Sequence, residues 1–466
     1  MRKQILLNRS EGGQKNTTSA KQVGLLEKIG YGLGDTAGNF VYQSVLLLLG
    51  FFYTEVYGLD TATVASIFLV VRVVDAITDP LMGALVDRTN TQWGKYRPYL
   101  IILCVPYAIA SVLVFTVPDF GPEGKVIYAY TTYITLMLLF TAINIPYGSM
   151  TGVMTSDPKE RASINATRFM FATGGGLIVT SLVLPMTKLW ENPAIGYRNA
   201  MILMAILSVV LFVICFLTTK ERVKGVEVKE RKSTVLKDLL FVVKNDQYRL
   251  VALATLLMVT AQTVKNTTQL YYITIYVEDA VKYSAMFLSV WMIGGMLGAQ
   301  LASKLLMYVD KKKAYELLLY ICAVASAASW FIGDNNIVMI MLLQFFVGFF
   351  NQMIAPIWFT FTADSVDYGE LKFKRRIDGL TLSFTLFSLK LGLSIGGAIA
   401  LIIMGYYGYK SGGIAQSNEA IQGILLVFSI VPAVIFIMTA LIVRLFKLNS
   451  KTIKENALKL EILRAQ

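Results

Sequence analysis

The sequence predicts an all-α membrane protein with twelve transmembrane helices in two pseudo-symmetric bundles of six. The chain has 466 residues, of which 55% are hydrophobic and only 16% are charged, and its mean hydropathy is +0.59. It is therefore far too apolar for a soluble protein of this length. Its apolar stretches have the length of about 20 residues with which a helix crosses a bilayer. One strongly charged segment separates them into two groups of equal number.

The apolar stretches define the elements in order. The six stretches of the first group cover residues 30–56, 62–86, 98–117, 126–150, 165–187 and 199–218. Those of the second group cover residues 248–276, 284–308, 314–332, 336–361, 379–405 and 420–446. The resulting domain prediction is an N-terminal tail, a first bundle, a charged linker, a second bundle and a C-terminal tail, at residues 1–28, 29–219, 220–247, 248–446 and 447–466.

The basic residues predict the orientation of the chain. Outside the apolar stretches, Lys and Arg gather in both tails and in every second loop. The other five loops hold only Lys125, Lys188, Arg198, Lys282 and Lys410. Because Lys and Arg concentrate on the cytoplasmic side of membrane proteins, we expect a multi-pass protein of the cell membrane with both termini in the cytoplasm.

The composition argues against several other classes of protein. The net charge of +13 does not indicate nucleic-acid binding, because the basic residues lie between apolar runs and not on one soluble face. With 0 His, and with 3 Cys that lack metal-ligand spacing, no metal site is expected beyond one for a transported Na⁺. We recognise no nucleophile–base pair and no phosphate-binding loop, so neither an enzyme nor a cofactor is expected.

Two carboxylates lie inside the second stretch. Arg72, Asp75 and Asp79 interrupt a segment that is otherwise apolar from Val64 to Val86. A charge at the bilayer centre costs at least ~2.5 kcal/mol, so such residues persist only where they face protein or a water-filled cavity. Asp75 and Asp79 are four residues apart and share one helix face. They predict a site for a small cation or a proton, and the alternative is a structural ion pair with Arg72.

The two halves of the chain resemble each other weakly. A glycine and then an acid–base cluster follow at the end of the second stretch, from Gly83, and of the eighth, from Gly298. The loops after the fourth and tenth stretches both carry clustered charges, beginning at Asp157 and Asp364. Such a repeat is typical of transporters that expose a central site alternately to the two sides of the membrane.

Charged residues at the cytoplasmic edge suggest a gate. One cluster follows the second stretch and the other follows the tenth, with members Asp87, Arg88, Lys95, Arg97, Asp364, Asp367, Glu370 and Arg375. Ion pairs between the two clusters would latch the outward-facing state and break when the inner side opens. The alternative is that these side chains are solvated loop residues.

Five motifs at consistent spacing resemble the glycoside-pentoside-hexuronide:cation symporters of the major facilitator superfamily, which include carriers of melibiose, glucuronides and xylosides. The resemblance extends from about residue 30 to residue 448. The segments that carry it are Tyr31–Asp35, Asp75–Pro80, Trp93–Pro98, Asn144–Gly148 and Asp364–Glu370. It implies the major facilitator fold and transport by alternating access.

The resemblance also implies roles for individual residues. Asp75 and Asp79 match the cation-binding acids of the family, and Arg168 and Lys390 match basic residues that line the sugar cavity. Asn39 and Asn144 stand where the melibiose carriers have acids, so Na⁺ coupling and galactoside binding do not follow from the resemblance. The pattern is closer to that of the xyloside and glucuronide carriers.

Further polar residues inside apolar stretches are candidates for sugar binding. Asp35 either accepts hydrogen bonds from sugar hydroxyls or pairs with Lys390, and Gln43 lies on the same expected helix. The seventh stretch is markedly polar between Ala261 and Gln269, and a sugar is a ligand that matches its amides and hydroxyls. Lys265 within it either neutralises a uronate carboxylate or balances one of the buried acids.

These observations predict a secondary active transporter. A gradient of H⁺ or Na⁺ is expected to drive symport of a sugar or glycoside, either a pentoside such as a xyloside or a hexuronide, as the two halves rock about a central site. The alternative from another class is an uncoupled sugar channel or a membrane sugar receptor. The expected partners are the sugar and membrane lipid, with no nucleic acid and no obligate protein partner.

Overall fold

A computed structural model describes residues 23–89, 91–155, 157–222, 244–277, 280–333, 336–373 and 378–465. The first half of the chain contains α2 (Leu25–Ser44) with the π-helical turns η1 (Val45–Leu49) and η2 (Phe52–Val56), α3 (Thr61–Arg88), α4 (Arg97–Val114), α5 (Pro122–Met154), α6 (Pro158–Thr187) and α7 (Pro193–Thr218). The second half contains α9 (Asp246–Tyr271) with the π-helical turn η3 (Tyr272–Tyr276), α10 (Ala280–Tyr308), α11 (Lys311–Ala328) with the 3₁₀ turn η4 (Ser329–Phe331), α12 (Ile337–Phe373), α13 (Asp378–Tyr406), α14 (Asn418–Arg444) and α15 (Ser450–Ala465).

Each predicted apolar stretch coincides with one long helix, in the predicted order. In the part of the chain that the structure describes, nine helices are long and apolar enough to cross a membrane, and α2, α9 and α11 are not among them. α2 and α9 are polar because they carry the side chains of the interior, and α11 is short and begins with three lysines. The C-terminal tail contains a further helix, α15, which the sequence analysis did not foresee.

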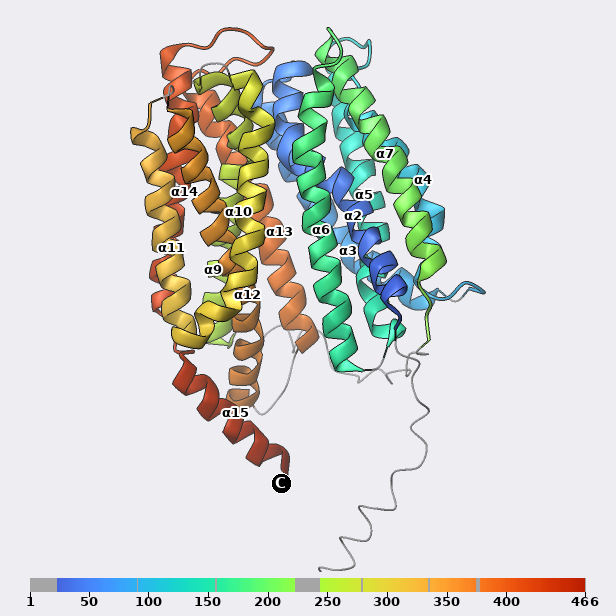
Figure 1. Ribbon diagram of the computed structural model, residues 1–466, viewed down its shortest axis with the longest axis vertical. Coiled ribbons are helices and arrows are strands. Elements are labelled where there is room, and N and C mark those ends of the chain that lie inside the picture. The colour runs from blue at the N-terminus through green and yellow to red at the C-terminus, as the bar shows by residue number, and fades with distance from the viewer. Residues whose placement is uncertain are drawn as a thin grey trace, which may run out of the picture.

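The contacts between helices repeat from one half to the other. In the first half α2 packs on α6 and α7, α4 packs on α5 and α7, and α3 packs on α5. In the second half α9 packs on α13 and α14, α11 packs on α12 and α14, and α10 packs on α12. The two halves meet where α3 packs on α13 and α6 packs on α10, and they lie side by side in Figure 1. This repetition confirms the predicted fold class of two pseudo-symmetric six-helix bundles. Of the predicted linker at residues 220–247, residues 223–243 lie outside the described residues.

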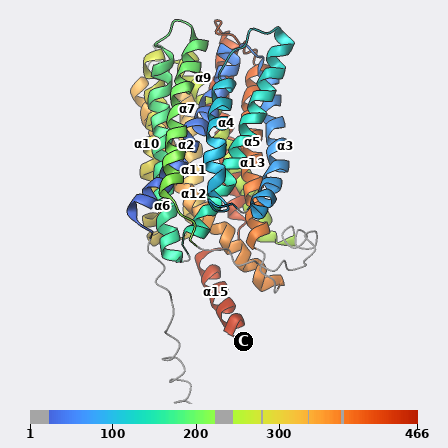
Figure 2. The same ribbon diagram turned by 90° about the vertical axis from the view of Figure 1, so that its right-hand side faces the viewer.

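The same end of the bundle holds the start of α2 and the end of α14. α15 extends from that end, away from the helices (Figures 1 and 2). On the flanks of the bundle, apolar side chains such as Ile202, Ile206 and Val210 of α7 are exposed. An outward-facing row of this kind is what a helix in contact with lipid requires, because the surrounding acyl chains are as apolar as the side chains themselves.

Glycines allow α10 and α12 to pack closely. A Cβ added to Gly298 would lie 1.9 Å from the carbonyl oxygen of Phe349, and one added to Gly294 would lie 2.3 Å from that of Phe345. Small residues four positions apart let helix backbones approach each other in membranes. Gly83, which the sequence repeat pairs with Gly298, has no atom within 4 Å of the corresponding position. The two glycines therefore have different roles in the structure.

We expect Gly298→Ala to destabilise the protein by about 1–3 kcal/mol, because the α12 backbone has to move away from the added methyl group. The measurement is thermal unfolding of the purified protein in detergent. Gly83→Ala is the matched control and should be neutral or slightly stabilising, since alanine favours a helix more than glycine does. Equal losses in the two variants would contradict this account of the α10–α12 contact.

Candidate functional site

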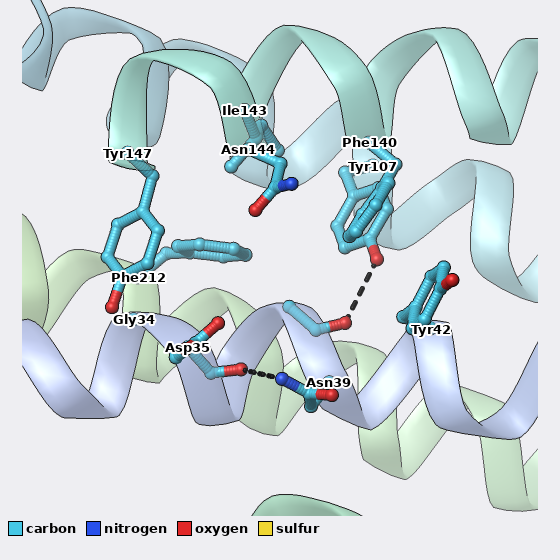
Figure 3. A pocket seen from close by; sticks show the side chains of 11 residues that line it. Gly34, Asp35, Asn39, Tyr42, Tyr107, Phe140, Ile143, Asn144, Tyr147 and Phe212 are labelled. Atoms are coloured by element: carbon cyan, nitrogen blue, oxygen red, sulfur yellow. Dashed lines mark hydrogen bonds between the residues drawn. The ribbon is translucent and has the colours of Figure 1, made fainter. Parts of the chain in front are cut away.

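A small polar cavity lies within the first half of the protein, between α2 and α5 (Figure 3). Its polar lining includes Asp35, Asn39 and Tyr42 from α2 and Asn144 from α5, and aromatic rings close its sides. The cavity measures about 40 Å³, which is room for water molecules but far below the ~300 Å³ of a typical ligand pocket. A sugar can occupy this site only after the surrounding helices have moved apart.

Asp35 is paired with Arg168, which connects α2 to α6. Arg168 Nε lies 2.8 Å from Asp35 Oδ2, and both side chains are largely shielded from solvent. The guanidinium carbon of Arg168 also lies 5.1 Å from the centre of the Tyr147 ring. The sequence analysis considered Lys390 as the protein partner of Asp35, whereas the structure places Arg168 there. Two residues assigned to the substrate thus meet at the edge of the cavity.

The remaining polar residues of α2 continue from Asp35 along one helix face. The Asn39 side-chain amide donates to the Asp35 carbonyl at 2.9 Å, and Gln43 Nε2 donates to Asn39 Oδ1 at 3.4 Å. Asn144 points from α5 into the same cavity (Figure 3). Amides that can exchange these weak local bonds for bonds to a ligand suit recognition of sugar hydroxyls.

Two tyrosines, Tyr31 and Tyr147, hold α2 against α5. The Tyr31 hydroxyl donates to the Tyr147 carbonyl at 2.8 Å, and the Tyr147 hydroxyl donates to the Tyr31 carbonyl at 2.5 Å. Their rings stack with centroids 4.6 Å apart. Both residues belong to motifs that carry the family resemblance, and for Tyr147 this is the signal that the sequence offers. They fix the helices on which the cavity is built.

The acids of α3 lie in different environments. The Asp75 side chain is 0% exposed, and its Oδ2 accepts a hydrogen bond from Arg72 NH1 at 3.0 Å. Among the residues that the structure describes, its Oδ1 has no hydrogen-bond partner. Asp79 Oδ1 accepts a hydrogen bond from Thr141 at 3.0 Å, and its Oδ2 pairs with Lys390 of α13. Nearly all buried polar groups in proteins have partners. An unpartnered carboxylate oxygen is therefore suited to receive a proton or a cation.

Lys390 joins the two halves at these acids. The resemblance implied a place for it in the sugar cavity, and the structure places it in an ion pair with Asp79. The pair connects α3 to α13, which pack on each other across the interface between the halves. A basic residue that holds a candidate ion-binding carboxylate across the interface can respond to the ion and change the interface at the same time.

The polar side chains of α9 are bound mainly within the second half. Gln262 donates to Asn351 of α12 at 2.8 Å, and Gln269 accepts a hydrogen bond from Gln344 of α12 at 3.1 Å. Lys265 Nζ donates to the Phe428 carbonyl of α14 at 3.3 Å. The structure therefore does not bring Lys265 or Gln269 to the cavity beside Asp35. These polar side chains of α9 form hydrogen bonds that hold α9 against α12 and α14.

Only the opposite face of α9 reaches the interface between the halves. Thr263 and Thr267 line a second small cavity together with Arg72 of α3 and Ser394 of α13. Tyr42 lines this cavity as well as the first one. The two cavities thus lie on either side of one tyrosine, and together they extend from the interior of the first half to the interface.

The predicted gate residues make contacts within their own halves. The backbone amides of Lys95 and Arg97 donate to Glu221 at 2.9 and 3.0 Å, and Arg97 NH2 donates to the Phe216 carbonyl at 2.6 Å. Asp364 pairs with Lys311.

The remaining gate candidates differ in their exposure to solvent. The Arg88 side chain is exposed, and Asp367 and Glu370 are half-buried near the end of α12. Arg375 and the side chain of Asp87 lie outside the described residues. A latch between the two clusters stays a prediction.

Polar contacts join the halves at the end of the bundle opposite the termini. Glu55 of η2 accepts hydrogen bonds from the Tyr409 hydroxyl and from the Gly413 amide, the latter at 3.2 Å. Beside it, the Thr54 hydroxyl lies 2.8 Å from the Tyr271 hydroxyl. Thr54 and Glu55 lie in η2, Tyr271 ends α9, and Tyr409 and Gly413 follow α13. This end of the interface is therefore held closed by hydrogen bonds as well as by packing.

The fold and the site together define a membrane transporter with two bundles about a central polar site, not an enzyme. The chain matches the family model described as "MFS/sugar transport protein" over residues 30–450 and belongs to that family. It is 36% identical to the "Inner membrane symporter YicJ" of Escherichia coli (strain K12), over 92% of this chain and 93% of that protein. It is 38% identical to the "Putative glycoside/cation symporter YagG" of the same organism, over 93% and 94% of the two chains.

A solved structure has the same fold. It is that of a bacterial homologue of the human lysosomal transporter Spinster, with a TM-score of 0.67 and 15% sequence identity, over 95% of this chain and 99% of that one. The predicted family and the multi-pass membrane architecture are thus confirmed.

We expect Tyr409→Phe to loosen the end of the interface that Glu55 holds, because the variant loses the hydroxyl that donates to this carboxylate. The readout is modification of a cysteine introduced at Leu46, which lines the cavity between the halves, after replacement of the buried native cysteines. A membrane-impermeant thiol reagent added from the side opposite the termini should react several-fold faster than in the unmodified background. Tyr406→Phe, at a neighbouring tyrosine that is 88% exposed, serves as the control, and equal rates in all backgrounds would show that the hydrogen bond does not hold this end closed.

Proposed function

We propose that this protein is a cation-coupled symporter of a neutral glycoside that works by alternating access. The observation that carries the coupling is the arrangement of Asp75, Asp79 and Lys390, in which an unpartnered carboxylate oxygen lies near an ion pair between the halves. The similarity to a putative glycoside/cation symporter supports the same reaction. A channel or a receptor needs no such coupling between an ion site and the interface.

The proposed coupling follows from competition at Asp79. In the structure the Lys390 ammonium neutralises Asp79. A proton or cation that binds at Asp75 and Asp79 takes over this role, and Lys390 is then free to leave Asp79 and to donate to a sugar hydroxyl. The ion and the sugar each favour the state in which Lys390 has moved, so each raises the affinity for the other by the same factor.

The proposed sugar site is the cavity beside Asp35, enlarged when the halves move. Asp35 can accept hydrogen bonds from two hydroxyl groups, while Asn39, Asn144 and Arg168 supply further donors. Tyr42, whose ring stacks on Phe140 with centroids 4.8 Å apart, offers an apolar surface for the face of a sugar ring. This combination of charged acceptors, amides and rings matches a polyhydroxylated ring.

The charge pattern favours a neutral substrate over a hexuronide. Asp35 is paired with Arg168, Asp75 with Arg72, and Asp79 with Lys390. A uronate would have to draw one of these bases away from its carboxylate in a region of low dielectric constant. A neutral pentoside or other glycoside replaces hydrogen bonds without disturbing this balance.

The proposed orientation places both termini in the cytoplasm. It rests on the concentration of Lys and Arg in the tails and alternate loops, and on the common end of the bundle from which α2 begins and at which α14 ends (Figure 1). The end held by Glu55 then faces the outside.

We expect Asp75→Asn and Asp79→Asn to abolish accumulation of the sugar, because neither variant retains both carboxylates of the ion site. Binding should survive with a loss below about tenfold, or 1.4 kcal/mol, since the proposed sugar contacts lie on other residues. Uptake is measured in membrane vesicles with imposed gradients of H⁺ and Na⁺, and binding is measured by calorimetry. Asp119→Asn, at an exposed loop carboxylate, is the control. Concentrative uptake at normal rates in both α3 variants would remove the assignment of the ion site, and accumulation by the unmodified protein without any gradient would remove symport.

A further inference from the structure

A proline in α14 leaves one backbone carbonyl without its helical partner. Pro432 lies inside α14 and is buried there. Because proline has no N–H, it cannot donate to the carbonyl four residues earlier, and its ring pushes that carbonyl away from the helix axis. The carbonyl is that of Phe428, and the Phe428 side chain is only 2% exposed. Inside a membrane protein such a freed group has to be satisfied by a neighbouring helix or by water.

Lys265 of α9 supplies the missing donor. Its Nζ donates to the Phe428 carbonyl at 3.3 Å and lies 3.6 Å from the centre of the Phe428 ring. The Lys265 side chain is 3% exposed. Tyr272, seven residues further along the same rod and on the same face, stacks on the Phe428 ring with centroids 4.0 Å apart. The carbonyl and the ring of one residue in α14 therefore hold α9 at two points.

We infer that Lys265 is a positioning residue, whose ammonium replaces the donor that Pro432 removes and thereby anchors α9 to α14. Lys265 lies on the face of α9 opposite the one that lines the cavity between the halves. Residues two positions to either side of Lys265 lie about 200° around the helix, and these are Thr263 and Thr267, which line the cavity between the halves. Lys265 sets the position of this face without touching a ligand.

An anchoring role accounts for the buried Lys265 better than a role in binding a charged substrate. Asp75, Asp35 and Asp79 are paired with Arg72, Arg168 and Lys390. Lys265 points instead toward α14, within the second half. An ammonium at the face of an aromatic ring is stabilised by the ring quadrupole, so the same contact that satisfies the carbonyl also accommodates the charge.

The test is a double-mutant cycle with Lys265→Met and Pro432→Ala, measured by thermal unfolding of the full-length protein in detergent. In the unmodified background, Lys265→Met leaves the Phe428 carbonyl without a partner, and the melting temperature should fall by about 1–3 °C. Alanine at position 432 restores the helical N–H donor. In that background the same substitution should lower the melting temperature by less than half as much. Equal losses in the two backgrounds would overturn the inference.

Two further variants separate the donor from the charge. Lys265→Gln keeps an N–H donor but has no charge, so it should retain most of the stability and most of the uptake. Where Lys265→Met is active, its KM for sugar should rise about threefold or more with a smaller change in maximal rate, because the cavity face of α9 shifts, and Pro432→Ala should reverse much of that rise. Pro106→Ala, at a proline inside α4 of the other half, is the control background and should leave the loss unchanged. A Lys265→Gln protein as impaired as Lys265→Met, with no rescue by Pro432→Ala, would show that the charge of Lys265 is what matters.

Discussion

The ion pair between Asp79 and Lys390 is the contact on which the arrangement of the two halves depends. It lies where α3 packs on α13, and the side chains of Lys390 and Asp79 are partly buried, at 29% and 27% exposed. Removing one partner would leave the other charge partly buried without its counter-charge, which would destabilise this contact. The other carboxylates of the interior have basic partners too, because Arg72 neutralises Asp75 and Arg168 neutralises Asp35. A ligand that carries positive charge to these acids therefore changes the free energy of the interface directly.

Other contacts of the structure determine where the interface between the halves can open. At the end opposite the termini, Glu55 and Thr54 bind residues of the other half. The cavities on either side of Tyr42 are too small for a sugar in this conformation. Access of a sugar thus requires that the helices around these cavities move apart. Close packing of α10 on α12 and the anchoring of α9 to α14 hold helices of the second half together.

Much of the fold could be predicted from the sequence because the bilayer sets strict requirements. The length of the apolar stretches indicates the helices, and the cost of buried charge singles out Asp75 and Asp79 as candidates for an ion site. The partners of the charged residues could not be predicted, because they depend on which helices become neighbours. Arg168 lies far from Asp35 in the sequence, yet α6 packs on α2, and this contact alone brings them together.

The contact of Lys265 is another that could not be predicted from the sequence. Charge and burial were evident in the sequence, whereas its partner is a backbone carbonyl that only the position of Pro432 in α14 leaves free. The polar run of α9 suggested sugar contacts for a similar reason. A helix that packs on several polar neighbours and one that lines a cavity have the same composition, so the sequence does not distinguish them. Gln262 and Gln269 bind α12, whereas Thr263 and Thr267 on the other face line the cavity between the halves.

The central claim, that ion binding at Asp75 and Asp79 releases Lys390 and so favours sugar binding, is tested most directly by thermodynamic linkage in the purified protein. Sugar affinity is measured by calorimetry as a function of pH without Na⁺ and as a function of Na⁺ concentration at fixed pH, for the unmodified protein and for Lys390→Gln. The account predicts that one of the two cations raises the affinity of the unmodified protein about 5–150-fold, that the sugar raises the affinity for that cation by the same factor, and that the dependence is largely lost in Lys390→Gln. A sugar affinity in the unmodified protein that is independent of both pH and Na⁺ would contradict it.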